Sequence, residues 1–176
     1  RTILLSQHIR QRQCAGRYIG YHMAYDDEIV IMLDGDDWLI DSMVLNKLNT
    51  FYRANKIMLS YGSYYDFFDG KIMNTLIAYH DFPEDIIKSK GYRKYRFLTG
   101  HLRTGYTKLF KSIKLEDLLY SDKTFLHLGT DYAEMMPVLE MADTLHRNIK
   151  TPLCIYNKDN SYKYTTSYGR VNEPDC

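Results

Sequence analysis

A continuous apolar run that ends in acidic residues most constrains how this chain can fold. Residues 28–33 read Glu-Ile-Val-Ile-Met-Leu, and Asp34, Gly35, Asp36 and Asp37 follow directly. An unbroken apolar run of this length, bounded by charge, predicts a strand buried on both faces. The acidic residues would then lie where the strand leaves the sheet, which is where α/β proteins bind ligands.

The acidic residues themselves predict a bound cation. Three carboxylates within four residues repel one another, which costs stability unless a positive charge lies among them. Hard oxygen ligands suit Mg²⁺ or Mn²⁺, ions that usually also bind substrate phosphates. An EF-hand calcium loop is excluded, because its fifth and sixth positions are occupied here by Trp38 and Leu39. We therefore expect a metal–diphosphate site, the simpler alternative being an acidic turn that caps the helix near Asp41.

The rest of the chain alternates between helices and strands. Helices are expected at about 9–25, after Asp41, at 115–120 and at 132–142, with a loop or short helix at 81–90. Strands are expected at 3–5, 57–63, 101–110 and 153–156, and Asp69-Gly70 predicts a hairpin turn between arms at 64–68 and 71–77. This order predicts an α/β domain with a mixed sheet flanked by helices.

Length and composition limit the number of domains and the kinds of partner. The 176 residues suffice for a single domain over 1–176. The net charge of +1 gives no reason to expect a nucleic-acid partner, and no apolar run approaches the roughly 20 residues of a transmembrane segment. Cys14, Cys154 and Cys176 are few and widely spaced, which favours a reducing compartment. We expect a cytoplasmic protein, with peripheral attachment to a membrane left open.

The sequence resembles glycosyltransferase family 2, whose members carry a strand followed by Asp-x-Asp-Asp and often by Trp-Leu. The corresponding residues here are 34–39, Asp-Gly-Asp-Asp-Trp-Leu. The resemblance continues, in the same order, through residues 101–104, 131–142 and 155–157. It implies a GT-A-like fold of the nucleotide-diphospho-sugar transferases. It also implies an inverting transfer of a sugar from a nucleotide-diphosphate sugar to an acceptor hydroxyl on a glycan, protein or lipid.

The same resemblance implies roles for the acidic residues. Asp36 would bind the Mn²⁺ or Mg²⁺ ion that bridges the donor diphosphate, and Asp34 would contact the donor ribose or support the metal. Asp37 would contact the metal ligands without binding the ion itself, or it would approach the donor sugar. Asp131 would be the general base that takes the proton of the acceptor hydroxyl, with Glu134 and Asp37 as the next candidates. The simpler alternative for Asp131, or its neighbour Thr130, is an N-cap of the following helix.

Four further residues are candidates for the sugar and phosphate contacts. His101 and Arg103 alternate along an expected strand and would share one face, where Arg suits a diphosphate and His suits the acceptor or the metal. Trp38 could stack on a sugar, and Glu134 is grouped with it as a sugar-contacting residue. His127 has a weaker claim to metal binding. The alternatives are a solvated strand face for the first two and a core position for Trp38.

One departure from the family pattern and two rival functions complete the prediction. Family members begin with a strand and loop that bind the nucleotide base, and this sequence contains no such segment, so we expect an N-terminally truncated domain. A nucleotidyltransferase of related fold would also use paired aspartates and a metal. It would usually carry a Gly-rich phosphate loop near its start, which is not found here. A non-catalytic glycan-binding domain with the same fold is the other alternative.

Overall fold

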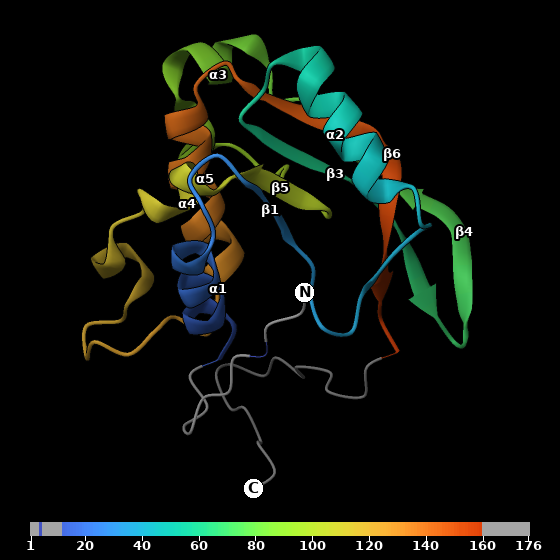
Figure 1. Cartoon of the computed structure of the whole chain (residues 1–176), viewed down its shortest axis with the longest axis horizontal. Coiled ribbons are helices and arrows are strands. Elements are labelled where there is room, and N and C mark those ends of the chain that lie inside the picture. Colours follow the sequence, from blue (N-terminus) through green and yellow to red (C-terminus); the bar gives the residue numbers. More distant parts are fainter. Residues whose placement is uncertain (1–3, 5–11, 160–176) are drawn as a thin grey trace, which may run out of the picture.

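One six-stranded mixed sheet organises the chain. The computed structural model describes Leu4 and residues 12–159, and Figure 1 shows their arrangement. The helices are α1 (Arg12–Met23), α2 (Val44–Asn55), α3 (Glu84–Ser89), α4 (Thr107–Lys111) and α5 (Thr130–Ala142), with short 3-10 helices η1 (Gly91–Lys94) and η2 (Leu115–Leu118). The strands are β1 (Ile29–Met32), β2 (Trp38–Leu39), β3 (Leu59–Phe68), β4 (Lys71–Ile77), β5 (Arg103–Tyr106) and β6 (His146–Asn157).

The order of the strands is β1-β5-β3-β6-β2, and β4 pairs with β3 outside this path. β3 and β6 run parallel, whereas the other neighbours are antiparallel. The predicted α/β class with a mixed sheet is therefore confirmed. None of the helices in the described part of the chain is long and apolar enough to cross a membrane.

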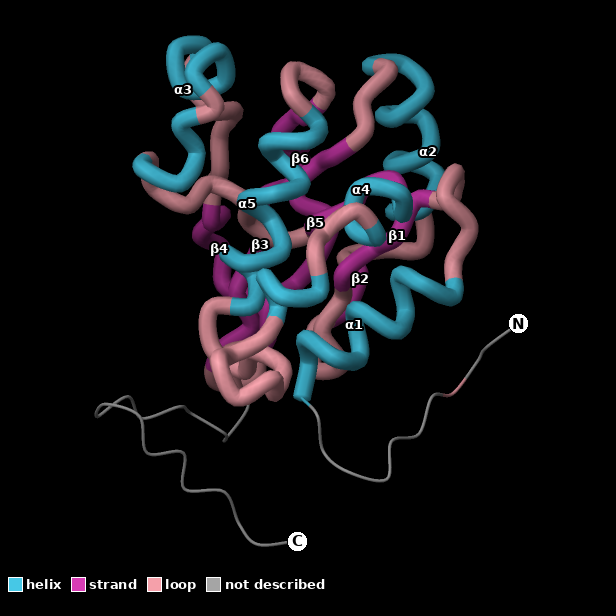
Figure 2. The backbone as a smooth tube through the Cα atoms, turned by 90° about the vertical axis from the view of Figure 1, so that its left-hand side faces the viewer, coloured by secondary structure: helices cyan, strands magenta, loops and turns pink. Residues whose placement is uncertain are grey.

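Helices cover both faces of the sheet. α2 packs one core on Leu102, Ile149 and Leu153, while α1, α4 and α5 pack the other on the opposite face. The alternation of β1 fits this arrangement, because Ile31 belongs to the first core and Met32 to the second. In Figure 2, α1, α4 and α5 lie in front of the strands. The acidic loop after β1 thus starts from a strand that is packed on both sides.

The hairpin between β3 and β4 forms where the sequence predicts it. Asp69 and Gly70 have φ values of 53° and 71°, the left-handed pair that a two-residue turn requires. Their N–H groups donate to the carboxylate of Asp159 at 2.7 and 2.8 Å. The expected strand at 57–63 and the first hairpin arm are one strand, β3, because pairing with β6 continues from one to the other across a register shift between Gly62 and Tyr64.

Several predicted details of the strands are wrong. β1 was expected to be buried on both faces, and each face does pack against a core, but three of its four residues are only half-buried. The reason is that, among the described residues, β1 pairs with β5 alone and so forms an edge of the sheet. The strand expected over 101–110 is limited to Arg103–Tyr106, since α4 begins at Thr107. The final strand is longer than 153–156, because pairing with β3 continues through its polar first half.

The predicted helix caps also need correction. The N-cap of α5 is Gly129, in a left-handed conformation without a side-chain bond, so neither Thr130 nor Asp131 caps this helix. The N-cap of α2 is Met43, two residues after Asp41. The N–H of Met43 donates to Asp41 Oδ1 at 2.8 Å. The strand expected at 3–5, apart from Leu4, and the first residues of the helix expected at 9–25 lie outside the described residues.

Candidate active site

The candidate site forms where the loop 33–37 meets the end of β5. β1 and β5 are antiparallel, and Met32 pairs with Arg103. The C-terminal end of β1 therefore lies beside the N-terminal end of β5, and His101, just before β5, reaches the acidic loop. At the other end of the loop, the N–H of Asn157 in β6 donates to Asp37 Oδ1 at 2.9 Å. The register of the sheet thus brings these segments together.

The loop also joins the two ends of the strand order. In a flat sheet, four steps of about 4.8 Å would separate β1 from β2 by roughly 19 Å. From Met32, the end of β1, to Trp38, the start of β2, the chain makes six Cα-to-Cα steps, which span at most about 22 Å when fully extended. This loop is not extended, since Asp37 N–H donates to Asp34 O at 3.1 Å. The sheet must therefore curl to let the loop close, and the curl places Asp34 and Asp37 over the same strand ends.

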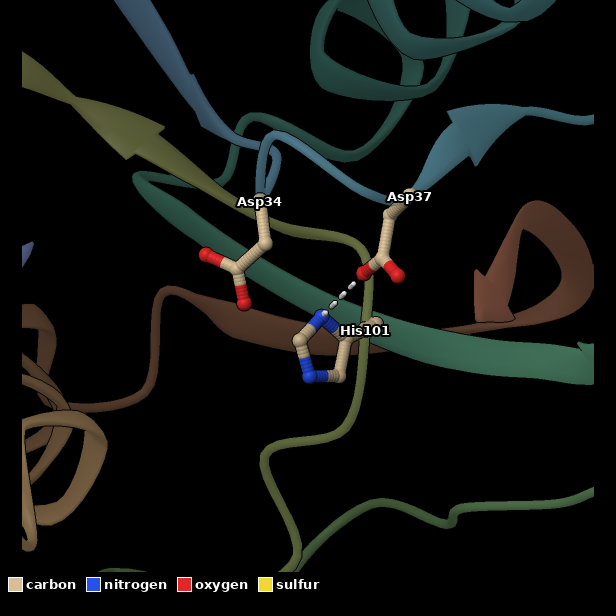
Figure 3. Close-up of side chains that lie close together, drawn as sticks. All are labelled: Asp34, Asp37 and His101. Atoms are coloured by element: carbon tan, nitrogen blue, oxygen red, sulfur yellow. Dashed lines mark ion pairs between the residues drawn. The ribbon is translucent and has the colours of Figure 1, made fainter. Parts of the chain in front are cut away.

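Three side chains converge in this loop region and form a group that could hold a metal ion. One potential ligand atom each from Asp34, Asp37 and His101 lies within 4.8 Å of the others. Figure 3 shows the two carboxylates and the imidazole ring drawn together, with His101 Nδ1 3.9 Å from Asp37 Oδ2. Asp36 is on the same loop but exposed, and it is not a member of this group. Its predicted role as a metal ligand stays a prediction.

The environment of Asp37 fits a cation. Its side chain is 1% exposed, and Oδ2 has no hydrogen-bond partner. Burial raises the pKa of Asp37 to about 6. A buried ionised oxygen without a partner is costly, and a cation would remove that cost. The residues present therefore fit a hard divalent ion, although nothing in the geometry identifies the metal.

His101 is suited to be a neutral ligand. Burial, followed by the nearby charge of Arg103, lowers the pKa of His101 to about 4. The ring is therefore uncharged at neutral pH, and only the uncharged imidazole binds a metal. His101 lies just before β5 and not within it, yet its Nε2 is 3.5 Å from Arg103 Nη2. The predicted proximity of these two residues is thus observed without the predicted strand alternation.

A second cluster of charged residues adjoins this group and is centred on Arg17 of α1. Arg17 Nη2 donates to Asp34 Oδ1 at 2.9 Å. Its Nη1 donates to Asp131 Oδ1 at 2.9 Å and to Glu134 Oε2 at 3.0 Å. Although burial opposes it, these carboxylates hold the pKa of Arg17 above its ordinary value. One charged guanidinium therefore connects the metal-binding loop to the first turns of α5.

Asp131 lies between two guanidinium groups. Arg103 Nη1 is 2.8 Å from the same Asp131 oxygen, in an ion pair that lacks hydrogen-bond geometry. Arg103 Nε donates instead to Thr99 O at 2.8 Å. Burial alone would raise the pKa of Asp131, but Arg103 and Arg17 outweigh it and lower that pKa. Asp131 is therefore ionised, and its side chain is 37% exposed.

Glu134 differs from Asp131 although both are bound to Arg17. Its side chain has no exposed surface, and Oε1 has no hydrogen-bond partner. Burial raises the pKa of Glu134 to about 7, and Arg17 only partly offsets this effect. A direct contact of Glu134 with a sugar stays a prediction, and it would require Arg17 to move.

Trp38 and His127, two other predicted residues, are not members of the metal-binding group. Trp38 is half-buried in β2 and meets the ring of Phe67 edge-on, with 5.1 Å between the centroids. His127 is exposed and packs on Tyr120, with 4.9 Å between the ring centroids. Among the described residues, His127 belongs to no group that could hold a metal.

Arg17 is the residue that the sequence interpretation missed. A signal was present, because Arg17 lies three residues after Cys14 and four before Tyr21, both buried positions of α1. An arginine on the inward face of a helix is rarely buried without a carboxylate partner. The identity of those partners could not be read from the sequence, since Asp131 and Glu134 are more than a hundred residues away.

A comparison of the sequence with protein-family models and with curated proteins finds no match.

Proposed function

We propose that this chain is the catalytic domain of a metal-dependent, inverting glycosyltransferase of GT-A type. It would transfer a sugar from a nucleotide-diphosphate sugar to an acceptor hydroxyl. The observation that carries the proposal is the unpartnered, buried Oδ2 of Asp37, in a group with Asp34 and His101 at a strand end. The Asp-Gly-Asp-Asp-Trp-Leu motif supplies Asp34 and Asp37 of this group, and its resemblance to family 2 implies the reaction.

Asp34, Asp37 and His101 would hold the ion, Mn²⁺ or Mg²⁺. When bound, such an ion supplies neutralisation of the charge that develops on the diphosphate leaving group. The protein contributes a fixed loop, because Asp37 is tied to β6 through Asn157 and Asp34 to α1 through Arg17. Asp36, exposed on the same loop, would be a further candidate for a ligand or a donor contact.

Asp131 would accept the proton of the acceptor hydroxyl. It is ionised, and its side chain is partly exposed close to the metal-binding loop. The two arginines that keep Asp131 ionised also weaken it as a base, because a lower pKa means a lower proton affinity. Glu134 has the pKa better matched to proton transfer at neutral pH, but it lacks exposed surface. Access therefore favours Asp131, which Arg17 and Arg103 would orient.

The acceptor and the location in the cell belong to the same proposal. The acceptor would be a glycan, a protein or a lipid. The two described cysteines, Cys14 and Cys154, are free and buried, in keeping with the reducing compartment that we expect.

The test is a panel of nucleotide-diphosphate sugars incubated with the protein and with Mn²⁺, Mg²⁺ or EDTA. Release of the nucleoside diphosphate is the readout, and we expect it with one donor and only with a metal. The Asp37→Asn variant should lose this release, whereas Asp117→Asn, at an exposed position of η2, should retain it. In a separate reaction with a nucleoside triphosphate and a sugar 1-phosphate, release of pyrophosphate would instead indicate a nucleotidyltransferase. Glycan binding without turnover of any donor would indicate a binding domain.

A further inference from the structure

Asp34 belongs both to the candidate metal-binding group and to the charged cluster around Arg17. It contributes a ligand atom to the group with Asp37 and His101. The same side chain accepts hydrogen bonds at Oδ1 from Gln13 and from Arg17, both on α1. The Asp34 carboxylate therefore already has a cationic partner, Arg17, supplied by the protein itself.

Arg17 has other partners that it can keep if it loses Asp34. Its contact with Asp34 uses Nη2, whereas Nη1 binds Asp131 and Glu134. Glu134 is fully buried, so its pairing with Arg17 is the more costly one to break. A small displacement of one nitrogen would thus free Asp34 while the arginine stays anchored on α5.

A divalent ion and a guanidinium cannot share Asp34 without repulsion. Two like charges about 4 Å apart repel by roughly 1 kcal/mol in water and by about 4 kcal/mol near a protein surface, and a doubly charged ion doubles this effect. The buried oxygen of Asp37 draws the ion to this position, because it has no hydrogen-bond partner of its own. The contact of Arg17 with Asp34 is therefore the one that must yield.

We propose that Arg17 and the divalent ion compete for Asp34. Arg17 neutralises Asp34 until the ion binds, and afterwards it holds only Asp131 and Glu134. This inference rests on the metal site of the proposed function and assigns a task to Arg17, which sets the affinity of the site for its ion. It also couples ion binding to Asp131, since the guanidinium that leaves Asp34 is the one that orients that carboxylate.

The test compares Mn²⁺ affinities by titration calorimetry. Arg17→Gln alone would leave Glu134 buried without a cation, so the substitution is made in a Glu134→Gln background and compared with Glu134→Gln itself. The double variant should bind Mn²⁺ roughly 10-fold more tightly, because the competitor is gone. Equal or weaker binding would overturn the proposal.

A control separates direct competition from the general effect of removing a nearby charge. Arg103→Gln in the same background removes a guanidinium that pairs with Asp131 and lies 3.5 Å from His101 Nε2, so its effect measures what a nearby charge contributes without the Arg17–Asp34 contact. Competition requires a clearly larger gain in Mn²⁺ affinity for Arg17→Gln than for Arg103→Gln, and equal gains would contradict it.

A second experiment follows Arg17 directly in the wild-type protein. Mg²⁺ should shift the NMR signal of the Arg17 Nε–H group at the midpoint of ion binding. Arg93, which pairs with Glu140 elsewhere on α5, should not respond. If the wild type and every variant bind no Mn²⁺, the metal site itself is wrong, and the competition falls with it.

Discussion

Asn157 donates its backbone N–H to Oδ1 of Asp37 and leaves the other oxygen of that buried carboxylate without a partner. The bond fixes the orientation of the carboxyl group, so that Oδ2 faces His101. A side chain that is held at one oxygen and unpaired at the other is preorganised for a ligand, because no internal hydrogen bond has to break when the ligand binds.

Asp37→Asn should weaken Mn²⁺ binding by at least 10-fold and leave the fold intact. The amide keeps an oxygen for the Asn157 bond but provides no charge for the ion. In the absence of metal, the variant should melt at the same temperature as the wild type or higher, since a buried carboxylate with a raised pKa has been neutralised. Calorimetry and thermal unfolding provide the two measurements, and an unchanged Mn²⁺ affinity would remove Asp37 from the site.

Asp36→Asn is the matched comparison on the same loop. Asp36 is exposed and lies outside the converging group, so its substitution should weaken Mn²⁺ binding less than Asp37→Asn does. The resemblance to family 2 implies the opposite order, with Asp36 as the main ligand. Measuring both variants in one buffer decides which assignment holds for this chain.

Asp131→Asn should lower sugar transfer by about 10²- to 10⁴-fold, the usual loss when a general base is removed. Binding of the metal and the donor should change far less than transfer does, because Asp131 contributes no ligand atom to the group of Asp34, Asp37 and His101. Asp131 is not the cap of α5, but it pairs with Arg17 and Arg103, whose side chains are only 12% and 4% exposed, so some loss of stability is expected as well and transfer is to be measured at a temperature where the variant stays folded. Single-turnover kinetics provide the test, and near-normal transfer would require another base.

Glu134 predicts a specific dependence of stability on pH. Its pKa is about 7 in the folded protein, compared with 4.5 as its ordinary value. The folded state therefore binds more protons than the unfolded state between these values, so the free energy of unfolding should fall as pH rises from about 4.5 to 7. In Glu134→Gln this contribution is absent, and the difference between the two proteins should change by roughly 2–3 kcal/mol across that range.

The difference in free energy of unfolding between the wild type and Glu134→Gln is the informative quantity, because other groups titrate in the same pH range. The pKa of His101 and that of His146 are both lowered to about 4, so their contribution runs in the opposite direction. They are present in both proteins and cancel in the subtraction. Denaturant titrations at a series of pH values give the two curves, and parallel curves would show that Glu134 does not titrate as described.

Gly70→Ala should destabilise the protein by about 1 kcal/mol. A Cβ at this position meets no atom within 4 Å, so the cost arises from its φ of +71° alone. Gly16→Ala, also in open space but within α1, is the matched control. It should stabilise the protein by roughly 0.5–1 kcal/mol, because Ala has the higher helix propensity. Urea unfolding of both variants should give shifts of opposite sign.

Local patterns in the sequence predicted the parts of the fold that depend on local chemistry. The Asp69-Gly70 turn and the apolar face of α2 are of this kind, because a left-handed turn and a helical period are set by adjacent residues. The half-exposed state of β1 was not predictable, since it depends on which strand lies beside it. The same limit explains Arg17, whose carboxylate partners on α5 are brought to it only by the packing of α1 against the rest of the domain.

The loop 33–37 closes the curl of the sheet, and this has a consequence for how binding could be detected far from the ligand. Because the loop connects β1 at one end of the strand order to β2 at the other, a ligand that stiffens it should also stiffen both ends. Amide hydrogens in the two-residue β2–β6 pairing and in the β1–β5 pairing should then exchange more slowly together. Hydrogen exchange at both ends of the strand order would thus report whether a ligand is bound at the loop.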